Sequence, residues 1–225
     1  AFKFKVYSKM IFKKADRLWF ISKEEIGNIG SDISLSNKSL HLPAAINETS
    51  IKQDLLTKNV LFIGALFMPN NMEAIIKKKK NVHSSLADYK GYKLIVVGST
   101  GEFDPKIYQN KFADYSNIEL YLNQKDISKY YEDSTVFINP MLHGAGVKLK
   151  TVNAIQKGLP LVSSKIGAEG IGLVKNEMYL EANTPEDFSN AILKILDKTI
   201  EEKQKMVIKA QNFLDENSYL SILKN

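Results

Sequence analysis

The sequence Pro140-Met-Leu-His-Gly-Ala-Gly-Val-Lys-Leu-Lys-Thr-Val-Asn-Ala-Ile-Gln-Lys-Gly-Leu-Pro160 predicts a glycine turn and a helix between two strands. Thr135–Asn139 precedes it as a short apolar run that indicates a buried strand. Pro140 ends that strand because proline has no amide hydrogen to donate. Gly158 and Pro160 end the helix and lead into the next strand, Leu161–Ser164.

The turn combines glycines with positive charge. Gly144 and Gly146 let the backbone turn tightly and approach a ligand, and a helix is expected to begin near Val147 with Lys148 and Lys150 in its first turn. Cations are unfavourable at a helix N-terminus, where the macrodipole favours anions. An anion bound by the turn amides explains both lysines, so we predict a phosphate site here. The alternative is an ordinary crossover with solvated lysines.

Strand-like and helical segments alternate along the chain. The strand-like runs lie at about 59–63, 92–97, 117–121, 135–139, 160–163 and 178–181, and the helical stretches at about 70–88, 104–113, 126–132, 147–157 and 185–197. This pattern predicts an α/β fold with a doubly wound, Rossmann-like parallel sheet. Such sheets bind ligands at the carboxyl ends of their strands, where Gly64, Gly98 and Gly144 fall. Asn70 or Asn71 is the expected cap of the first helix.

Taken in order, these segments resemble the C-terminal half of GT-B glycosyltransferases of family 4, also called group 1. The resemblance covers about two thirds of the chain, from near residue 58 to near residue 200. It implies a bacterial enzyme of glycan or polysaccharide biosynthesis that transfers a sugar from a nucleotide diphosphate to an acceptor hydroxyl. The matching segments are Asn59–Gly64, Tyr92–Gly98, Asn117–Tyr121, the Pro140–Pro160 block, Ile166–Gly170 and Tyr179–Phe188.

The resemblance also implies a division of the chain. Residues 1–50 correspond to the end of an N-terminal acceptor lobe, 51–58 to a linker, 59–200 to the nucleotide-sugar-binding domain, and 201–225 to helices that cross back to the first lobe. Within this partial second lobe, Ser22 is the expected cap of a helix and Leu42–Ala45 the end of a strand. We expect the first half of the acceptor lobe to be missing and the fragment alone to be inactive.

The resemblance assigns catalytic roles to Lys148 and Lys150, which would stabilise charge on the leaving diphosphate. The backbone amides of the turn, from Gly144 through Ala145 and Gly146 to Val147, would assist them.

Two glutamates that the family carries eight residues apart fall on Ala145 and Asn153. Asn153 can still accept a hydrogen bond from a ribose hydroxyl. It loses the charge-assisted bond, a difference of roughly 1 kcal/mol.

Three further residues have two open interpretations each. Glu169 binds a sugar hydroxyl or is a solvated loop acid. Asp126 lies beside the nucleobase or, as the favoured alternative, caps a helix. His143 contacts the diphosphate or is an ordinary loop residue. We expect no metal site, because cysteine is absent and the histidines are scattered, and no cofactor beyond the nucleotide-sugar substrate.

Composition limits the class of partner. The formal charge is +6, but the 31 basic residues include a single arginine, Arg17. Because base recognition depends on bidentate arginine, we expect no nucleic-acid partner. The Lys77–Lys80 run is expected at a solvated helix end, and a membrane-surface or nucleic-acid patch is the alternative. No apolar run approaches the roughly 20 residues of a membrane span.

The expected partners are therefore a nucleotide-sugar donor and a saccharide or lipid-linked acceptor. We expect a cytoplasmic protein, and peripheral contact with the inner face of the membrane stays open. Two other functions remain. A non-catalytic module that has lost donor affinity is supported by Asn153. A nucleotide-sugar epimerase shares the architecture, but the acids and histidine expected in its cleft are not found in the sequence.

Overall fold

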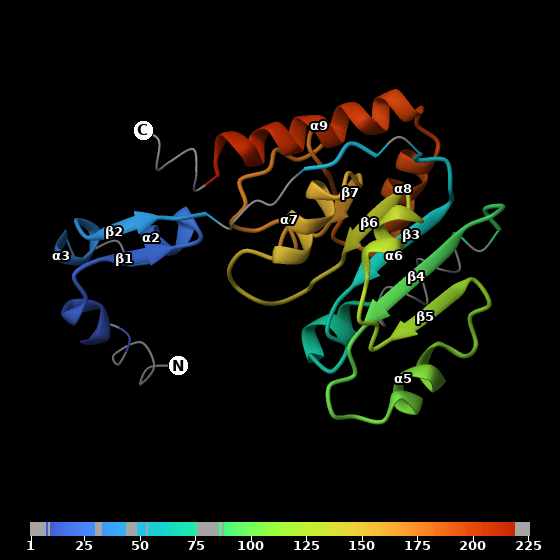
Figure 1. Cartoon of the computed structure of the whole chain (residues 1–225), viewed down its shortest axis with the longest axis horizontal. Helices are drawn as coiled ribbons and strands as arrows, with labels where there is room; N and C mark the ends of the chain where they lie inside the picture. The colour runs from blue at the N-terminus through green and yellow to red at the C-terminus, as the bar shows by residue number, and fades with distance from the viewer. Residues whose placement is uncertain are drawn as a thin grey trace.

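The computed structural model describes residues 8, 10–29, 33–43, 49–52, 54–75, 86 and 88–218, with the side chains of residues 28, 29 and 33 left out. These residues form a six-stranded sheet and a separate two-stranded sheet (Figure 1). All ladders of the larger sheet are parallel, which confirms the predicted fold class. Its strands are β3 (Asn59–Ile63), β4 (Lys93–Gly98), β5 (Ile118–Leu122), β6 (Val136–Asn139), β7 (Leu161–Ser163) and β8 (Leu180–Glu181).

The strand order of the larger sheet is β5-β4-β3-β6-β7-β8. The chain therefore builds outward from β3 through β4 to β5 and then returns to the other side of β3 with β6. The order reverses between β3 and β6, and open α/β sheets bind ligands at the carboxyl ends of the strands beside such a reversal. Gly64 follows β3 and Pro140 follows β6, so the Pro140–Pro160 block lies at this reversal.

Helices cover both faces of the sheet. Alternate side chains of each strand enter different apolar clusters: Phe62 and Val96 lie in one, and Leu61 and Val97 in the other. Burial on both faces is typical of parallel sheets and explains why the strands are continuously apolar. The described helices of this lobe are α5 (Pro105–Phe112), α6 (Ser128–Glu132), α7 (Leu149–Gln156), α8 (Pro185–Leu196) and α9 (Ile200–Glu216). Nowhere in the described ranges is a helix long and apolar enough to cross a membrane.

The smaller sheet belongs to a first lobe beside the larger one (Figure 1). Its strands β1 (Leu18–Phe20) and β2 (Ser39–His41) pair in parallel and are connected through α2 (Lys23–Ile29) and α3 (Ile33–Ser36). Ser22 Oγ accepts a hydrogen bond from the Glu24 amide at 3.2 Å, as expected of a helix cap.

Several expected boundaries differ from the structure. β2 ends at His41, before the predicted end at Leu42–Ala45. α7 begins at Leu149, two residues after the predicted start, because Lys148 has an extended backbone with φ −93° and ψ 95°. Helical structure is described for residues 69–75 of the expected helix 70–88. The Lys77–Lys80 run and residues 219–225 lie outside the described residues.

Helix α9 fastens the linker to the second lobe. The ammonium of Lys203, whose side chain is 3% exposed, donates to the carbonyl of Leu55 at 3.1 Å. Gln211 Nε2 donates to the carbonyl of Ser50 at 2.9 Å. Figure 1 shows α9 running along the second lobe with its C-terminal end toward the first. Among the described residues between the lobes, Ser50 and Leu55 are therefore held by side chains of α9.

Gly98 ends β4 directly beneath the loop that follows β3. A Cβ at this position would lie 2.3 Å from the carbonyl oxygen of Gly64 and 2.6 Å from Leu66 Cγ. Neither contact is possible for a real side chain, so the loop after β3 can cross the end of β4 only above a glycine.

We expect Gly98→Ala to lower the free energy of unfolding by about 2–3 kcal/mol, since the added methyl group meets backbone. Gly27→Ala in α2 is the matched control, because nothing lies within 4 Å of its Cβ position. That change should be neutral or stabilise by up to about 1 kcal/mol through helix propensity. Urea denaturation of both variants measures the difference, and equal effects would contradict the proposed packing.

Candidate functional site

A buried polar network fixes the segment after β6. Asn139 Nδ2 donates to Thr151 Oγ1 at 2.8 Å and to the Gly167 carbonyl at 3.1 Å, and Thr151 Oγ1 donates to the same carbonyl at 2.8 Å. All three contacts are buried, where unpaired polar groups are costly. The network therefore ties the end of β6 to the first turn of α7 and to the loop after β7.

Ser164 connects the segments after β6 and after β7 by hydrogen bonds. Its hydroxyl donates to the Met141 carbonyl at 2.5 Å and accepts from the Gly167 amide at 3.0 Å. A Cβ at Gly167 would lie 2.4 Å from Ser163 Oγ, so only glycine fits. These residues were not predicted from the sequence, although polar side chains at the ends of two buried strands could have indicated them.

The glycine turn is supported from inside by Lys148. Gly144 and Gly146 have φ values of +118° and +78°, which favour glycine. The Lys148 ammonium donates to the Gly144 carbonyl at 3.2 Å and to the Gly146 carbonyl, and it lies 3.4 Å from Glu169 Oε2. With only 8% of its surface exposed, Lys148 therefore has its donors directed to the turn and to Glu169.

Lys150 has a different environment. Its ammonium donates to Asn71 Oδ1 at 2.6 Å and lies 4.8 Å from the centre of the Phe62 ring. Burial, followed by the nearby Lys148 charge, lowers the pKa of Lys150 to about 8. Among the described side chains Lys150 forms no ion pair. A desolvated cation without a counter-charge therefore lies at the strand reversal.

Asn71 positions this cation and was misassigned from the sequence. The prediction that Asn70 or Asn71 caps a helix is wrong, because both lie inside the helical residues 69–75. The Nδ2 of Asn71 donates to the Ala65 carbonyl at 3.0 Å while its Oδ1 accepts from Lys150. A Cβ on Gly64 would lie 3.0 Å from Asn71 Cγ. Asn71 therefore contacts both Gly64 and Lys150, which come from distant segments of the chain.

The remaining predicted residues are placed as follows. Asn153 is exposed on α7, three residues after Lys150 and so on the same side of the helix. His143 and Ala145 are exposed in the turn, and Val147 is half-buried. Asp126 is exposed and accepts from the Ser128 amide at 2.9 Å, a bond that lowers its pKa. The N-cap of α6 is Ile127, so the capping alternative placed the cap one residue too early.

The first lobe touches the glycine turn. A Cβ at Gly146 would lie 3.5 Å from Glu25 Oε1, and one at Gly170 would lie 3.1 Å from Ser22 Oγ and 3.2 Å from Val147 Cγ2. The start of α2 therefore packs against the turn and the loop after Glu169. The sequence analysis did not predict this contact.

Comparison with known proteins gives two kinds of match. The family model described as "Glycosyl transferases group 1" matches residues 57–198. An uncharacterized 44.6 kDa protein in the cps region of Klebsiella pneumoniae is 32% identical over 219 residues, which are 95% of this chain and 55% of that protein. The chain thus spans about half the length of this curated relative.

Solved structures share the fold at low identity. A variant of TarM from S. aureus, in complex with fondaparinux, alpha-GlcNAc-glycerol and UDP, matches with a TM-score of 0.74 and 17% identity over 96% of this chain and 45% of its own. HepE of Anabaena, in complex with UDP and glucose, matches with a TM-score of 0.74 and 14% identity over 97% of this chain and 64% of its own.

We expect Lys148→Met to lower the free energy of unfolding by about 1–3 kcal/mol, because the Gly144 and Gly146 carbonyls and Glu169 lose their buried donor. Lys157→Met, at the exposed C-terminal end of the same helix, should change it by less than about 0.5 kcal/mol. Thermal and urea denaturation compare the two. Equal stability of the variants would mean that Lys148 does not support the turn.

Proposed function

The chain belongs to the group 1 glycosyl transferases, and from this premise we propose that its six-stranded lobe binds a nucleoside-diphosphate sugar. In the complete protein the sugar is transferred to an acceptor hydroxyl. The observation that carries the proposal is the uncompensated Lys150 ammonium at the strand reversal. A diphosphate bound there supplies the negative charge that this half-buried cation lacks among the described residues.

Charge development gives Lys150 its proposed role. As the bond between the sugar and the diphosphate breaks, negative charge grows on the departing phosphate oxygens. A cation already desolvated and oriented by Asn71 stabilises that charge without reorganising. Amides of Ala145 and Val147 are proposed as further diphosphate contacts, whereas the Gly64 amide already donates to the Val97 carbonyl at 3.1 Å. Lys148 holds the turn in shape.

The sugar nucleotide extends from this point along α7 in the proposal. Asn153 lies on the Lys150 side of the helix and is exposed, so its amide oxygen is available to a ribose hydroxyl. Glu169 is proposed near the sugar, with its charge balanced by Lys148. Gly98 packs under the loop after β3, and Asp126 accepts from the Ser128 amide at the start of α6, so the proposal does not depend on either residue.

The relatives support the substrate class. The TarM variant and HepE were solved with UDP, which favours a uridine diphosphate donor as the first to test. The Klebsiella relative comes from a cps region, which supports a role in polysaccharide biosynthesis with a saccharide or lipid-linked acceptor.

A non-catalytic module is the second candidate. Two observations favour it: Asn153 stands where the family carries a glutamate, and the charge of Lys148 is already balanced by Glu169. The two candidates differ in donor binding, because the module would have no measurable affinity for a nucleotide sugar.

We expect the protein to bind UDP most tightly below about pH 8 and progressively more weakly above it. The pKa of Lys150 is about 8 in the free protein, so above that pH the ammonium loses its proton, and anion binding must take the proton up again. Isothermal calorimetry at about pH 7, 8 and 9, in buffers of different ionisation enthalpy, measures both the affinity and the proton uptake.

Variants assign this behaviour to Lys150. Lys150→Ala should weaken UDP binding by roughly 10- to 100-fold, the loss of about 1.5–3 kcal/mol typical of a hydrogen bond to a charged group. Lys150→Arg should remove the pH dependence, because a guanidinium stays charged throughout. Lys157→Ala controls for net charge. UDP binding that is equal in the parent and Lys150→Ala proteins would exclude this diphosphate site.

The complete protein tests transfer itself. We expect it to transfer a sugar from one member of a nucleotide-sugar panel, and the 225-residue chain alone to be inactive because it spans about half the length of its curated relative. Asn153→Glu should preserve or strengthen donor affinity, by up to about 1 kcal/mol. Donor binding by calorimetry and sugar transfer by product analysis separate the outcomes. A complete protein that binds no nucleotide sugar would favour the non-catalytic module.

A further inference from the structure

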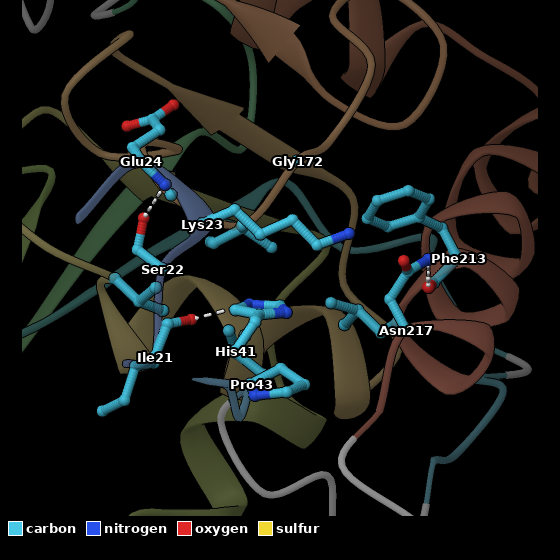
Figure 2. Close-up of a pocket in the computed structure, with 14 residues that line it drawn as sticks. Ile21, Ser22, Lys23, Glu24, His41, Pro43, Gly172, Phe213 and Asn217 are labelled. Atoms are coloured by element: carbon cyan, nitrogen blue, oxygen red, sulfur yellow. Dashed lines mark hydrogen bonds between the residues drawn. The ribbon is translucent and has the colours of Figure 1, made fainter. Parts of the chain in front are cut away.

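A pocket of about 150 Å³ lies between the two lobes, behind the glycine turn. Residues from both lobes line it, from the β1–α2 turn and the end of β2 to α7, the loop at 170–172 and the end of α9. Figure 2 shows His41 in the middle of this lining, with Lys23 and Pro43 on either side of it in that view. None of these lining residues is needed for the proposed diphosphate contacts, apart from the backbone of Val147.

His41 presents an unused hydrogen-bond acceptor. Its Nε2 lies 3.1 Å from the carbonyl oxygen of Ile21, and since a carbonyl only accepts, Nε2 carries the proton (Figure 2). Burial is the main cause that lowers the pKa of His41, with a further contribution from Lys23, so the ring is neutral near pH 7 and Nδ1 is an acceptor. Nδ1 is buried and has no partner among the described residues.

The rest of the wall is mainly apolar. The lining also holds the polar side chains of Ser22, Lys23, Glu24 and Asn217, so a ligand that satisfies Nδ1 competes there with water. A cavity of about 150 Å³ with aliphatic and aromatic walls is known to accept a molecule the size of benzene. The apolar side chains are those of Val147, Val152, Ile171, Phe213 and Leu214.

We propose that this interlobe pocket binds a small organic ligand with a benzene-sized apolar body and one hydroxyl or amide hydrogen that it donates to His41 Nδ1. The apolar body replaces water against the aliphatic wall, and the donor satisfies the acceptor that the fold leaves unpaired. Such a ligand contacts both lobes at once, so it favours the arrangement in which α2 packs on the glycine turn. The inference is independent of the proposed transfer reaction.

Phenol and toluene test the proposal, because they share a shape and differ in the donor. In NMR titrations of the chain, phenol should bind with a dissociation constant on the order of 1 mM, and toluene about fivefold more weakly. The amides of Ile171, Gly172 and Asn217, which line the pocket, should shift with phenol. If neither compound binds, or both bind equally, the proposal is wrong.

Two variants assign the interaction. His41→Phe keeps a ring of similar shape without the acceptor, so phenol should bind about fivefold more weakly while toluene changes by less than about twofold. An equal loss for both ligands would instead show that His41 only shapes the pocket and would overturn the proposal. Ile171→Phe fills the space from a loop position and should abolish binding of both compounds. Binding that survives this change would place the ligand elsewhere and also contradict the proposal.

Discussion

The hydrogen bonds that Asn139 makes at the end of β6 are the constraint on which the site depends. The buried Nδ2 of Asn139 donates to α7 and to the loop after β7, while its Oδ1 has no hydrogen-bond partner among the described residues. Three segments that the sequence separates are thereby held at one point of the sheet edge. The start of α7 is fixed by these bonds, and with it the side on which Lys150 projects. The apolar core fixes the position of the sheet, and this buried polar network fixes the position of the residues at its carboxyl edge.

Lys148 and Lys150 differ in role because the groups around their ammonium ions differ in charge. The ammonium of Lys148 is surrounded by carbonyl oxygens of the turn and by Glu169, which balance its charge within the protein. Lys150 meets an aromatic ring and a neutral amide oxygen, which solvate a cation only weakly. The protein thus uses one cation for its own loop and leaves the other incompletely solvated, as expected for a group that completes its environment with a ligand.

The sequence predicts the parts of this structure that are local. The apolar runs give six parallel strands, and Gly144 and Gly146 mark the turn because their backbone angles require glycine. It does not predict contacts between distant segments. Asn71 looks like a helix cap until Lys150, 79 residues later, is placed beside it. Likewise, nothing in the composition of α2, β2 or α9 indicates that they share a pocket, because each contributes only a few residues to it.

The attachment of the linker to α9 has a consequence for how such proteins can be recombined. Ser50 and Leu55 are bound by side chains that follow them by 161 and 148 residues. The linker is therefore a structural part of the second lobe and is not a neutral spacer. An exchange of second lobes between relatives that cuts at the start of β3 would separate Lys203 and Gln211 from their carbonyl partners. The transferable module begins at Ser50 and extends through α9.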